Sequence, residues 1–290
     1  MRAARIAAVV VALAIVATIV IVLTRLDFID EALDSEYCEA EVGGDVARLE
    51  LDQAENAALI AAIGVRRDLP ARAVSIALAT AFQESKIRNL DYGDRDSLGI
   101  FQQRPSQGWG SPEEIQDPVY ATETFFDALV EVDGYEDMPI HDAAQAVQRS
   151  ADGDAYALHE TPARVLASAL TGYSPAAFRC EIDEPTESEQ RTGDDGLTSN
   201  ARAVVDDVKA AFGAVGSAAG DAGQTVRLSP PGAGTRRHGW ALAQYLVGQA
   251  DRLAITTVSF DGRIWRASES GEGWQDGGGR GRDQIRVVVA

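Results

Sequence analysis

The chain has 290 residues, with 26 Lys and Arg against 45 Asp and Glu, which gives a formal charge of −19. This balance argues against a protein that coats DNA or RNA, because such a partner needs a basic surface. Three scattered His and two distant Cys cannot supply the ligands of a zinc finger or an iron–sulfur cluster. The length fits one large domain or two small ones, and 46% apolar residues suffice for an ordinary core.

The N-terminal segment contains a long apolar run from Ile6 to Leu23, interrupted only by Thr18. At about 1.5 Å per residue it reaches roughly 27 Å, about the thickness of a bilayer core. Arg2 and Arg5 precede the run and acidic residues follow it, which predicts a cytoplasmic N-terminus. We therefore expect a single-pass protein of the cell membrane, with the bulk of the chain extracytoplasmic. A cleaved signal peptide is the alternative.

Cys38 and Cys180 are the two cysteines of the chain. In an exported protein two cysteines most simply form one disulfide, so we expect this pair to be bonded. Two unpaired thiols are the alternative. The bonded pair would bracket a domain, because the sequence changes character immediately after Cys180.

Between the two cysteines the apolar pattern is helical. Asp52, with Glu55 three residues later, predicts a capped helix start, and Gly64 predicts its end. Pro70 suits the first residue of a second helix with one apolar stripe. Further helices are expected from Asp117-Pro118 through Leu129, over Asp142–Gln148 and over Pro162–Leu170.

The sequence after Cys180 predicts a linker and a second module. Acidic and small polar residues from Glu181 to Asn200 predict a solvated linker, and a helix is expected from about Asn200 to Phe212. Asp261-Gly262 predicts the two-residue turn of a hairpin. The elements expected around this turn are a helix over Trp240–Leu253, strands over Ile255–Phe260 and Arg263–Ala267, and a last strand over Gln284–Ala290.

Glu84 is the main candidate for chemistry. The stretch Ala81-Phe82-Gln83-Glu84-Ser85 ends an apolar helix, and a segment rich in Gly, Asp and Asn follows it. Apolar neighbours favour the protonated form of a carboxyl group, as a general acid near neutral pH requires. The alternative is a surface glutamate in the last turn of a helix.

Glu84-Ser85, a polar loop, Ser97-Leu98-Gly99-Ile100-Phe101-Gln102 and Pro105 resemble the Glu-Ser…Ser-x-Gly-x-x-Gln…Pro signature of lytic transglycosylases, members of the lysozyme-like superfamily. The longer string from Asn89 to Gly110 resembles exported actinobacterial members of that group. The resemblance covers roughly residues 51–180. It implies cleavage of peptidoglycan between N-acetylmuramic acid and N-acetylglucosamine. Glu84 would protonate the glycosidic oxygen and then act as base while the muramyl 6-hydroxyl closes onto C1, with no metal or cofactor.

With this resemblance, the expected fold is a mainly α lysozyme-like domain plus a small α+β C-terminal domain, with one N-terminal transmembrane helix. The expected divisions are residues 1–26 (cytoplasmic tip and anchor), 27–50 (acidic juxtamembrane segment), 51–180 (transglycosylase domain), 181–224 (acidic linker and helix) and 225–290 (C-terminal module).

The resemblance also implies residues that bind substrate. Gln102 would line the sugar cleft, where its amide can donate and accept hydrogen bonds. Ser97 either faces the site or holds the loop, and Gly99 is expected to serve the backbone through close approach or a positive φ. Tyr92 and Trp109 are candidates for stacking on sugar faces, with a place in the core as the alternative.

One departure from the family concerns its Ala-Tyr-Asn-Ala-Gly-like motif, whose Tyr lies near the acid. The local counterpart, Ala146–Ser150, has no Tyr. Gln148 is expected to take the amide role, and Tyr156 is the candidate that could approach from elsewhere. The departure makes a non-catalytic peptidoglycan-binding or scaffold protein the alternative function. A lysozyme-type hydrolase is a further alternative, with a second acid from Asp91, Asp94 or Asp96.

The C-terminal module resembles small wall-associated domains related to zinc peptidases. Gln284 and Arg286 stand where the ligands of a His-x-His pair are expected, and His238 alone remains. Because catalytic zinc normally needs three protein ligands, we expect no metal and no peptidase activity. The expected partners are peptidoglycan glycan strands, with a cell-wall protein as a candidate partner of residues 225–290 and no nucleic acid.

Overall fold

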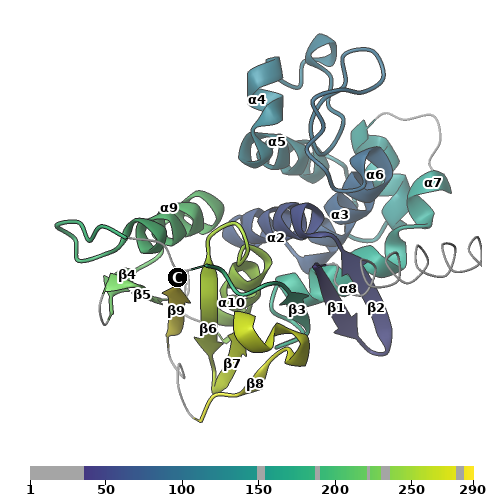
Figure 1. Ribbon diagram of the computed structural model, residues 1–290. Coiled ribbons are helices and arrows are strands. Elements are labelled where there is room, and N and C mark those ends of the chain that lie inside the picture. Colours follow the sequence, from purple (N-terminus) through teal and green to yellow (C-terminus); the bar gives the residue numbers. More distant parts are fainter. Residues whose placement is uncertain (1–35, 149–153, 187–189, 221–222, 230–235, 279–283) are drawn as a thin grey trace, which may run out of the picture. The chain divides into compact units, whose positions relative to one another are not determined.

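The computed structural model describes residues 36–148, 154–186, 190–220, 223–229, 236–278 and 284–290. Residues Tyr37–Ala290 form one compact unit. Its helices are α2 (Leu51–Arg66), α3 (Ala71–Ser85), α4 (Pro112–Gln116), α5 (Pro118–Val130), α6 (Ile140–Gln148), α7 (Asp154–Ala157), α8 (Glu160–Leu170), α9 (Ser199–Phe212) and α10 (Arg236–Gly248) (Figure 1). Short 3-10 helices cover Pro105–Gln107 and Ala267–Glu272.

Two antiparallel sheets accompany these helices. The first has the order β2-β1-β3 and consists of β1 (Tyr37–Val42), β2 (Asp45–Leu49) and β3 (Phe178–Glu181). The second has the order β4-β5-β9-β6-β7-β8 and consists of β4 (Ser217–Ala219), β5 (Thr225–Leu228), β6 (Ile255–Phe260), β7 (Arg263–Arg266), β8 (Gln275–Asp276) and β9 (Ile285–Val289).

The first sheet corrects the expected fold class. A mainly α lysozyme-like domain preceded by an acidic juxtamembrane segment does not describe this chain, because β1 and β2 form a hairpin within residues 27–50 and β3 pairs with β1. Gly43 and Gly44 make the turn with φ of +65° and +93°, which glycine adopts without steric cost. Alternate residues of the hairpin, such as Ala40 and Leu49, are buried.

The expected membrane location is also corrected. Among the described residues, no helix is long and apolar enough to cross a bilayer. The expected single-pass topology, with a cytoplasmic N-terminus and an extracytoplasmic remainder, is therefore not supported by the structure. The apolar run on which that expectation rested, residues 6–23, lies outside the described residues.

Helix α2 lies in the middle of the helical part and differs from its expected bounds. It is capped by Glu50 rather than Asp52, because the Glu50 side chain and Gln53 form a capping box. Gly64 does not end the helix, which runs to Arg66. A Cβ on Gly64 would lie 2.5 Å from a Val74 methyl carbon, so the glycine instead permits close packing of α2 on α3.

The elements expected after residue 225 are confirmed in kind. Strands β6 and β7 form the hairpin, with Asp261 and Gly262 both at positive φ, as a type I′ turn requires. Helix α10 begins earlier than expected and packs against α2. Gln249, just past its end, donates from Nε2 to the Glu55 carbonyl at 3.0 Å. These contacts cross the boundary expected at residue 225.

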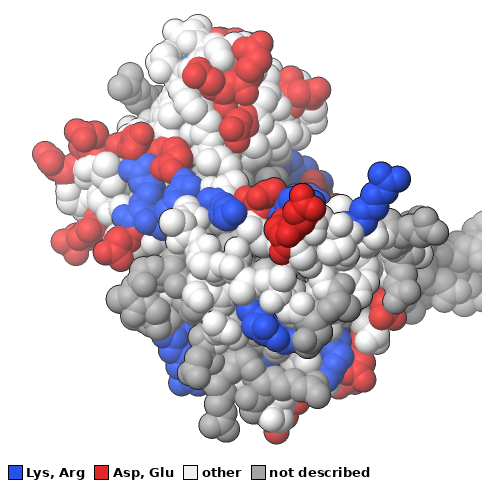
Figure 2. Space-filling model, turned by 90° about the vertical axis from the view of Figure 1, so that its left-hand side faces the viewer, with Lys and Arg blue, Asp and Glu red and all other residues white. Residues whose placement is uncertain are grey.

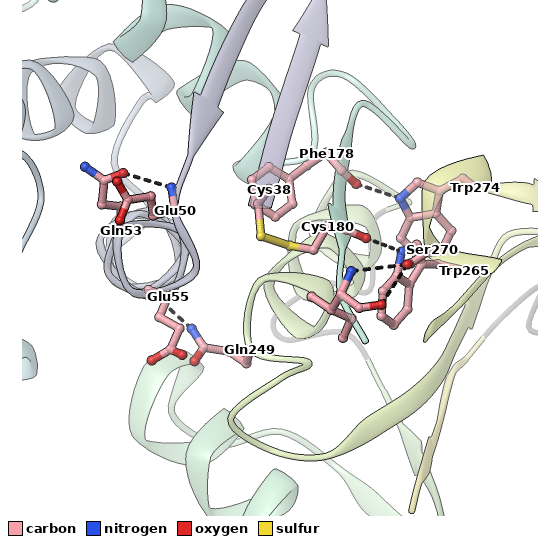
Figure 3. Close-up of a disulfide and its surroundings, with 11 residues drawn as sticks. Cys38, Glu50, Gln53, Glu55, Phe178, Cys180, Gln249, Trp265, Ser270 and Trp274 are labelled. Atoms are coloured by element: carbon pink, nitrogen blue, oxygen red, sulfur yellow. Dashed lines mark hydrogen bonds between the residues drawn. A yellow bond between two sulfur atoms is a disulfide. The ribbon is translucent and has the colours of Figure 1, made fainter. Parts of the chain in front are cut away.

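Strand β3 connects the first sheet to the C-terminal part of the molecule. On one side Cys180 stands opposite Cys38 of β1 and is bonded to it, which confirms the expected disulfide. On the other side, side chains of the C-terminal part cover its outer edge (Figure 3). Trp265 Nε1 donates to the Cys180 carbonyl at 3.2 Å, and Trp274 Nε1 donates to the Phe178 carbonyl at 2.8 Å. An edge strand is thereby satisfied by side chains instead of a further strand.

Gln244 of α10 makes a second connection to β3 and is completely buried. Its Oε1 accepts from the backbone N–H groups of Ala177 and Phe178, both at 2.9 Å. Its Nε2 donates to the Ala169 carbonyl at the end of α8, at 2.5 Å. One amide thus satisfies three buried backbone groups from two elements.

The negative charge is concentrated in the helical part. Residues 105–148 contain ten acidic residues and no Lys or Arg. Figure 2 shows these acidic side chains over the upper part of the molecule, where α4 and α5 lie, with basic and acidic side chains interspersed below. Some of the charge is paired, since Glu123 meets Arg67 at 2.7 Å. The unpaired remainder gives this region a field that repels polyanions.

The disulfide should stabilise the whole unit. It joins cysteines 142 residues apart in sequence, and closing so long a loop contributes about 4–5 kcal/mol through the entropy of the unfolded chain. We expect Cys38→Ser, Cys180→Ser and the reduced wild type to melt at the same lowered temperature in calorimetry. An unchanged melting temperature in either variant would contradict this role.

Gln244→Leu should destabilise the protein by about 2–4 kcal/mol, because the backbone N–H groups of Ala177 and Phe178 lose their acceptor. Urea unfolding followed by circular dichroism measures the loss. Gln107→Leu, at an exposed position, is the matched control and should be nearly neutral. Equal stabilities of the two variants would show that the Gln244 amide is dispensable.

Candidate active site

Glu84 lies in the last turn of α3 and is half-buried. The helix ends immediately after it, because Lys86 and Ile87 both take positive φ values, +57° and +59°. Such a backbone is unusual for a β-branched residue and is typical of functional sites. Helix α2 holds both residues in place: Gln53 Nε2 donates to the Lys86 carbonyl and Asn56 Nδ2 to the Ile87 carbonyl, each at 2.8 Å.

Tyr156 of α7 provides a phenol for this glutamate. Its hydroxyl donates to Glu84 Oε1 at 2.6 Å, and its side chain is 1% exposed. A hydroxyl-to-carboxylate bond of this length is in the strong, charge-assisted range. The structure therefore places a tyrosine on the candidate acid although the local Ala146–Ser150 segment lacks one.

The loop after α3 is fastened beside Glu84 by side chains. Ser85 Oγ donates to the Ile100 carbonyl at 2.6 Å, and Gln148 Nε2, at the end of α6, donates to the Phe101 carbonyl at 2.7 Å. Two consecutive carbonyls of the loop are thus held from two helices. Gln148, expected as a sugar-binding amide, uses its donor to position this loop.

Gln102 follows these carbonyls at a φ of +49°. Its Nε2 lies 3.2 Å from the Gly99 carbonyl and 3.3 Å from the Tyr92 carbonyl, so the amide braces the loop from within. A Cβ on Gly93 would lie 2.6 Å from the Ser97 carbonyl oxygen, so the close approach of the backbone favours glycine at that position.

The other residues that the sequence placed at the site differ from one another in burial and in contacts. Ser97 is buried within the loop, and Gly99 has a φ of +77° with no room for a Cβ beside the Ile115 carbonyl, as a backbone role requires. Tyr92 is 68% exposed. Trp109 is half-buried and lines a cavity with Glu131 of the α5 end and with the α6 residues just before Gln148.

Sequence reasoning missed His159 and the role of Ser85. The His159 ring stacks on Phe82 with centroids 5.5 Å apart, and its Nε2 lies 3.1 Å from Gln83 Oε1. Burial lowers the pKa of His159, which keeps the ring neutral at pH 7. The sequence feature that could have pointed to His159 is its position three residues after Tyr156, in the short segment that leads into α8.

Asp96 belongs to the loop and is held by it. Its carboxylate accepts from Arg104 Nε and from the Ser106 backbone N–H, both at 2.8 Å. The hydrogen bond from Arg104 holds the pKa of Asp96 well below its ordinary value of 3.8. Of the three aspartates considered as a second acid, Asp96 is thus committed to an ion pair, while Asp91 and Asp94 are exposed.

The candidate metal position in the C-terminal part contains no cluster of ligands. His238 lies 2.6 Å from an Arg237 guanidinium nitrogen, and burial together with this charge lowers the pKa of His238. Gln284 is exposed, and Arg286 contacts Thr225 Oγ1 at 3.4 Å. In the described part of the chain, no three His, Cys, Asp or Glu side chains are grouped to hold a metal.

The comparison with protein families assigns part of the C-terminal half. Residues 193–287 match the family described as VldE, C-terminal domain. The match contains α9, α10 and almost the whole second sheet, and it does not reach Glu84 or Tyr156. No curated protein matches the chain. The functional assignment of the helical part, which contains the candidate active site, therefore depends on its geometry and on the motif around Glu84.

Removing Asp96 should release the loop. The depressed pKa means that its contribution is fully present above pH 3.8 and is lost only as the pH falls through the lower folded value. We expect the Ser106 amide to be equally protected from hydrogen exchange at pH 7 and pH 4 in wild type. In Asp96→Ala it should exchange about tenfold faster or more at both pH values. Asp94→Ala is the control, and equal exchange in the two variants would contradict this account.

Proposed function

We propose that the protein is a peptidoglycan lytic transglycosylase with Glu84 as its general acid and base. The observation that carries the proposal is the hydrogen bond from Tyr156 to Glu84 Oε1 at 2.6 Å. It supplies the tyrosine whose absence from the local motif argued for a non-catalytic protein. The Glu-Ser…Gln motif and the fastened loop beside it support the same assignment.

The two carboxyl oxygens of Glu84 take different roles in this proposal. Tyr156 donates to Oε1, so the exchangeable proton of the acid form resides on Oε2. Glu84 passes that proton to the glycosidic oxygen as the bond to C1 of the muramyl unit breaks. The carboxylate, stabilised by Tyr156, then takes the proton of the muramyl 6-hydroxyl while its oxygen bonds to C1. The product is a 1,6-anhydro end, and Glu84 regains its proton.

The state of the aspartates favours this reaction over hydrolysis. Glycosidases that use water position two carboxylates on either side of the scissile bond. Asp96 is bound by Arg104 and Ser106, and Asp91 and Asp94 are exposed in the loop. A transglycosylase needs a single carboxylate, because the substrate supplies its own nucleophile.

The cavity beside the end of α6 suits the sugar chain. Trp109 and Val132 provide apolar surface, and Gln107 and Glu131 provide polar groups. Aromatic surface with a few polar side chains is the usual lining of a small-molecule site. Gln107 and Trp109 belong to the same stretch between α3 and α4 as the fastened loop, so sugar bound in this cavity would contact that stretch.

Tyr156→Phe should lower the turnover of peptidoglycan about 10- to 100-fold, since it removes a charge-assisted hydrogen bond worth about 1.5–3 kcal/mol. Tyr120→Phe, which removes a hydroxyl on α5 outside the proposed site, is the matched control and should retain activity. Release of soluble muropeptides measures the rate. Full activity of Tyr156→Phe would remove the main support for the proposal.

Digestion of purified peptidoglycan by the full chain tests the reaction itself. Wild type should release anhydromuropeptides identified by mass spectrometry, and Glu84→Gln should lower the rate by about 10²-fold or more. Glu113→Gln, in the exposed acidic region, is the matched control. Reducing ends in place of anhydro ends would indicate a hydrolase. Sedimentation with the wall but no soluble product would indicate a non-catalytic binding protein.

A further inference from the structure

A second cavity lies at the opposite end of α3 from Glu84. It is lined by Ala71, Arg72 and Ser75 of α3, by Arg164 and Ser168 of α8, and by Tyr173 just after α8. Arg72 and Glu84 are about three helical turns apart, which separates them by roughly 18 Å along the helix axis. The cavity is therefore distinct from the candidate active site, although α3 contributes to both.

The cavity is basic in a chain that is strongly acidic. Its lining includes two arginines and no acidic residue. Arg72 is half-buried and donates to the Met138 carbonyl, while its Nε is buried without a hydrogen-bond partner in the described part of the chain. Because Nε is closed off by protein atoms, a ligand in the cavity would meet the outer N–H groups of this guanidinium, and a carboxylate is the anion whose geometry best matches them.

The second arginine is available for exchange. Arg164 is exposed and pairs with Glu160 on the same helix at 2.7 Å. Exposed ion pairs between neighbouring turns are weak, so a carboxylate brought in by a ligand can replace Glu160. Two guanidinium groups would then face one anion from α3 and α8.

An aromatic ring and two hydroxyl groups complete the lining. Tyr173 is 59% exposed, unusually so for a large aromatic ring, and the Arg237 guanidinium carbon lies 5.0 Å from its ring centroid. The hydroxyl of Ser168 shares a hydrogen bond with that of Ser174 at 2.8 Å, and Ser75 lies one turn from Arg72. A flat ring with neighbouring hydroxyls suits the face and hydroxyl groups of a pyranose better than a bare ion.

We propose that this cavity binds a saccharide unit that carries a free carboxylate, with Arg72 and Arg164 on the carboxylate and Tyr173 against the sugar ring. The inference deepens the proposed function and rests on it for the identity of the polymer. Muramyl units without a peptide expose a lactyl carboxylate. The cavity thus selects strands with such units and holds them several saccharide units away from Glu84.

Calorimetric titration of the full-length Glu84→Gln protein tests this inference without cleavage. The probes are a muramyl oligosaccharide with free lactyl carboxylates, the same oligosaccharide with these converted to carboxamides, and a free stem peptide. We expect the carboxylate form to bind about tenfold tighter than the carboxamide, with a preference that weakens as salt is added. Equal affinity of the two oligosaccharides, or tighter binding of the peptide alone, would overturn the inference.

Variants of the lining locate the binding. Arg72→Gln and the exposed Arg164→Gln should each abolish the preference for the carboxylate, and Tyr173→Ala should weaken both oligosaccharides. Arg191→Gln, at an exposed position outside the cavity, is the matched control. A preference that persists in both lining variants would overturn the site. A wild-type protein that keeps this preference but releases no product would refute the proposed function alone, and cleavage without any preference would refute this inference alone.

Discussion

Strand β3 holds the helical part of the molecule and the second sheet together. Its Cys180 is bonded to Cys38, its outer carbonyls accept from the indoles of Trp265 and Trp274, and its first N–H groups are bound by Gln244. An edge strand with these partners is shared between the helical part and the second sheet. The helical part and the C-terminal elements are therefore parts of one packed unit.

Helix α2 connects the C-terminal elements to the candidate active site. The C-terminal elements contact α2 at Glu55, and the next residue of α2, Asn56, holds the Ile87 carbonyl just beyond Glu84. The strained backbone after α3 is thus supported by a helix that is itself held by the C-terminal elements. Tyr156 and Gln148 then complete the site from α7 and α6.

The sequence predicted those features whose signals are local. Asp117-Pro118 begins α5, and Asp261-Gly262 makes the hairpin turn, because cap and turn chemistry depends on few neighbouring residues. The β1–β2 hairpin was missed although Gly43-Gly44 separates two alternating segments, since its acidic residues resembled a solvated stretch. Gly64 was misread because its role is packing on α3, a tertiary contact.

The site was predictable only in part for the same reason. Glu84 and its loop form one contiguous motif, whereas Tyr156 reaches Glu84 only through the packing of α7, and Gln148 binds a backbone carbonyl that sequence spacing does not reveal.

In the proposed reaction the 6-hydroxyl of the substrate, and not water, attacks C1 after Glu84 donates its proton. Digestion of peptidoglycan in oxygen-18-labelled water, with mass spectrometry of the new saccharide ends, distinguishes the two nucleophiles. We expect anhydro ends without the label, formed by wild type and lost in Glu84→Gln. Labelled reducing ends, or unlabelled anhydro ends that form equally in the variant, would contradict it.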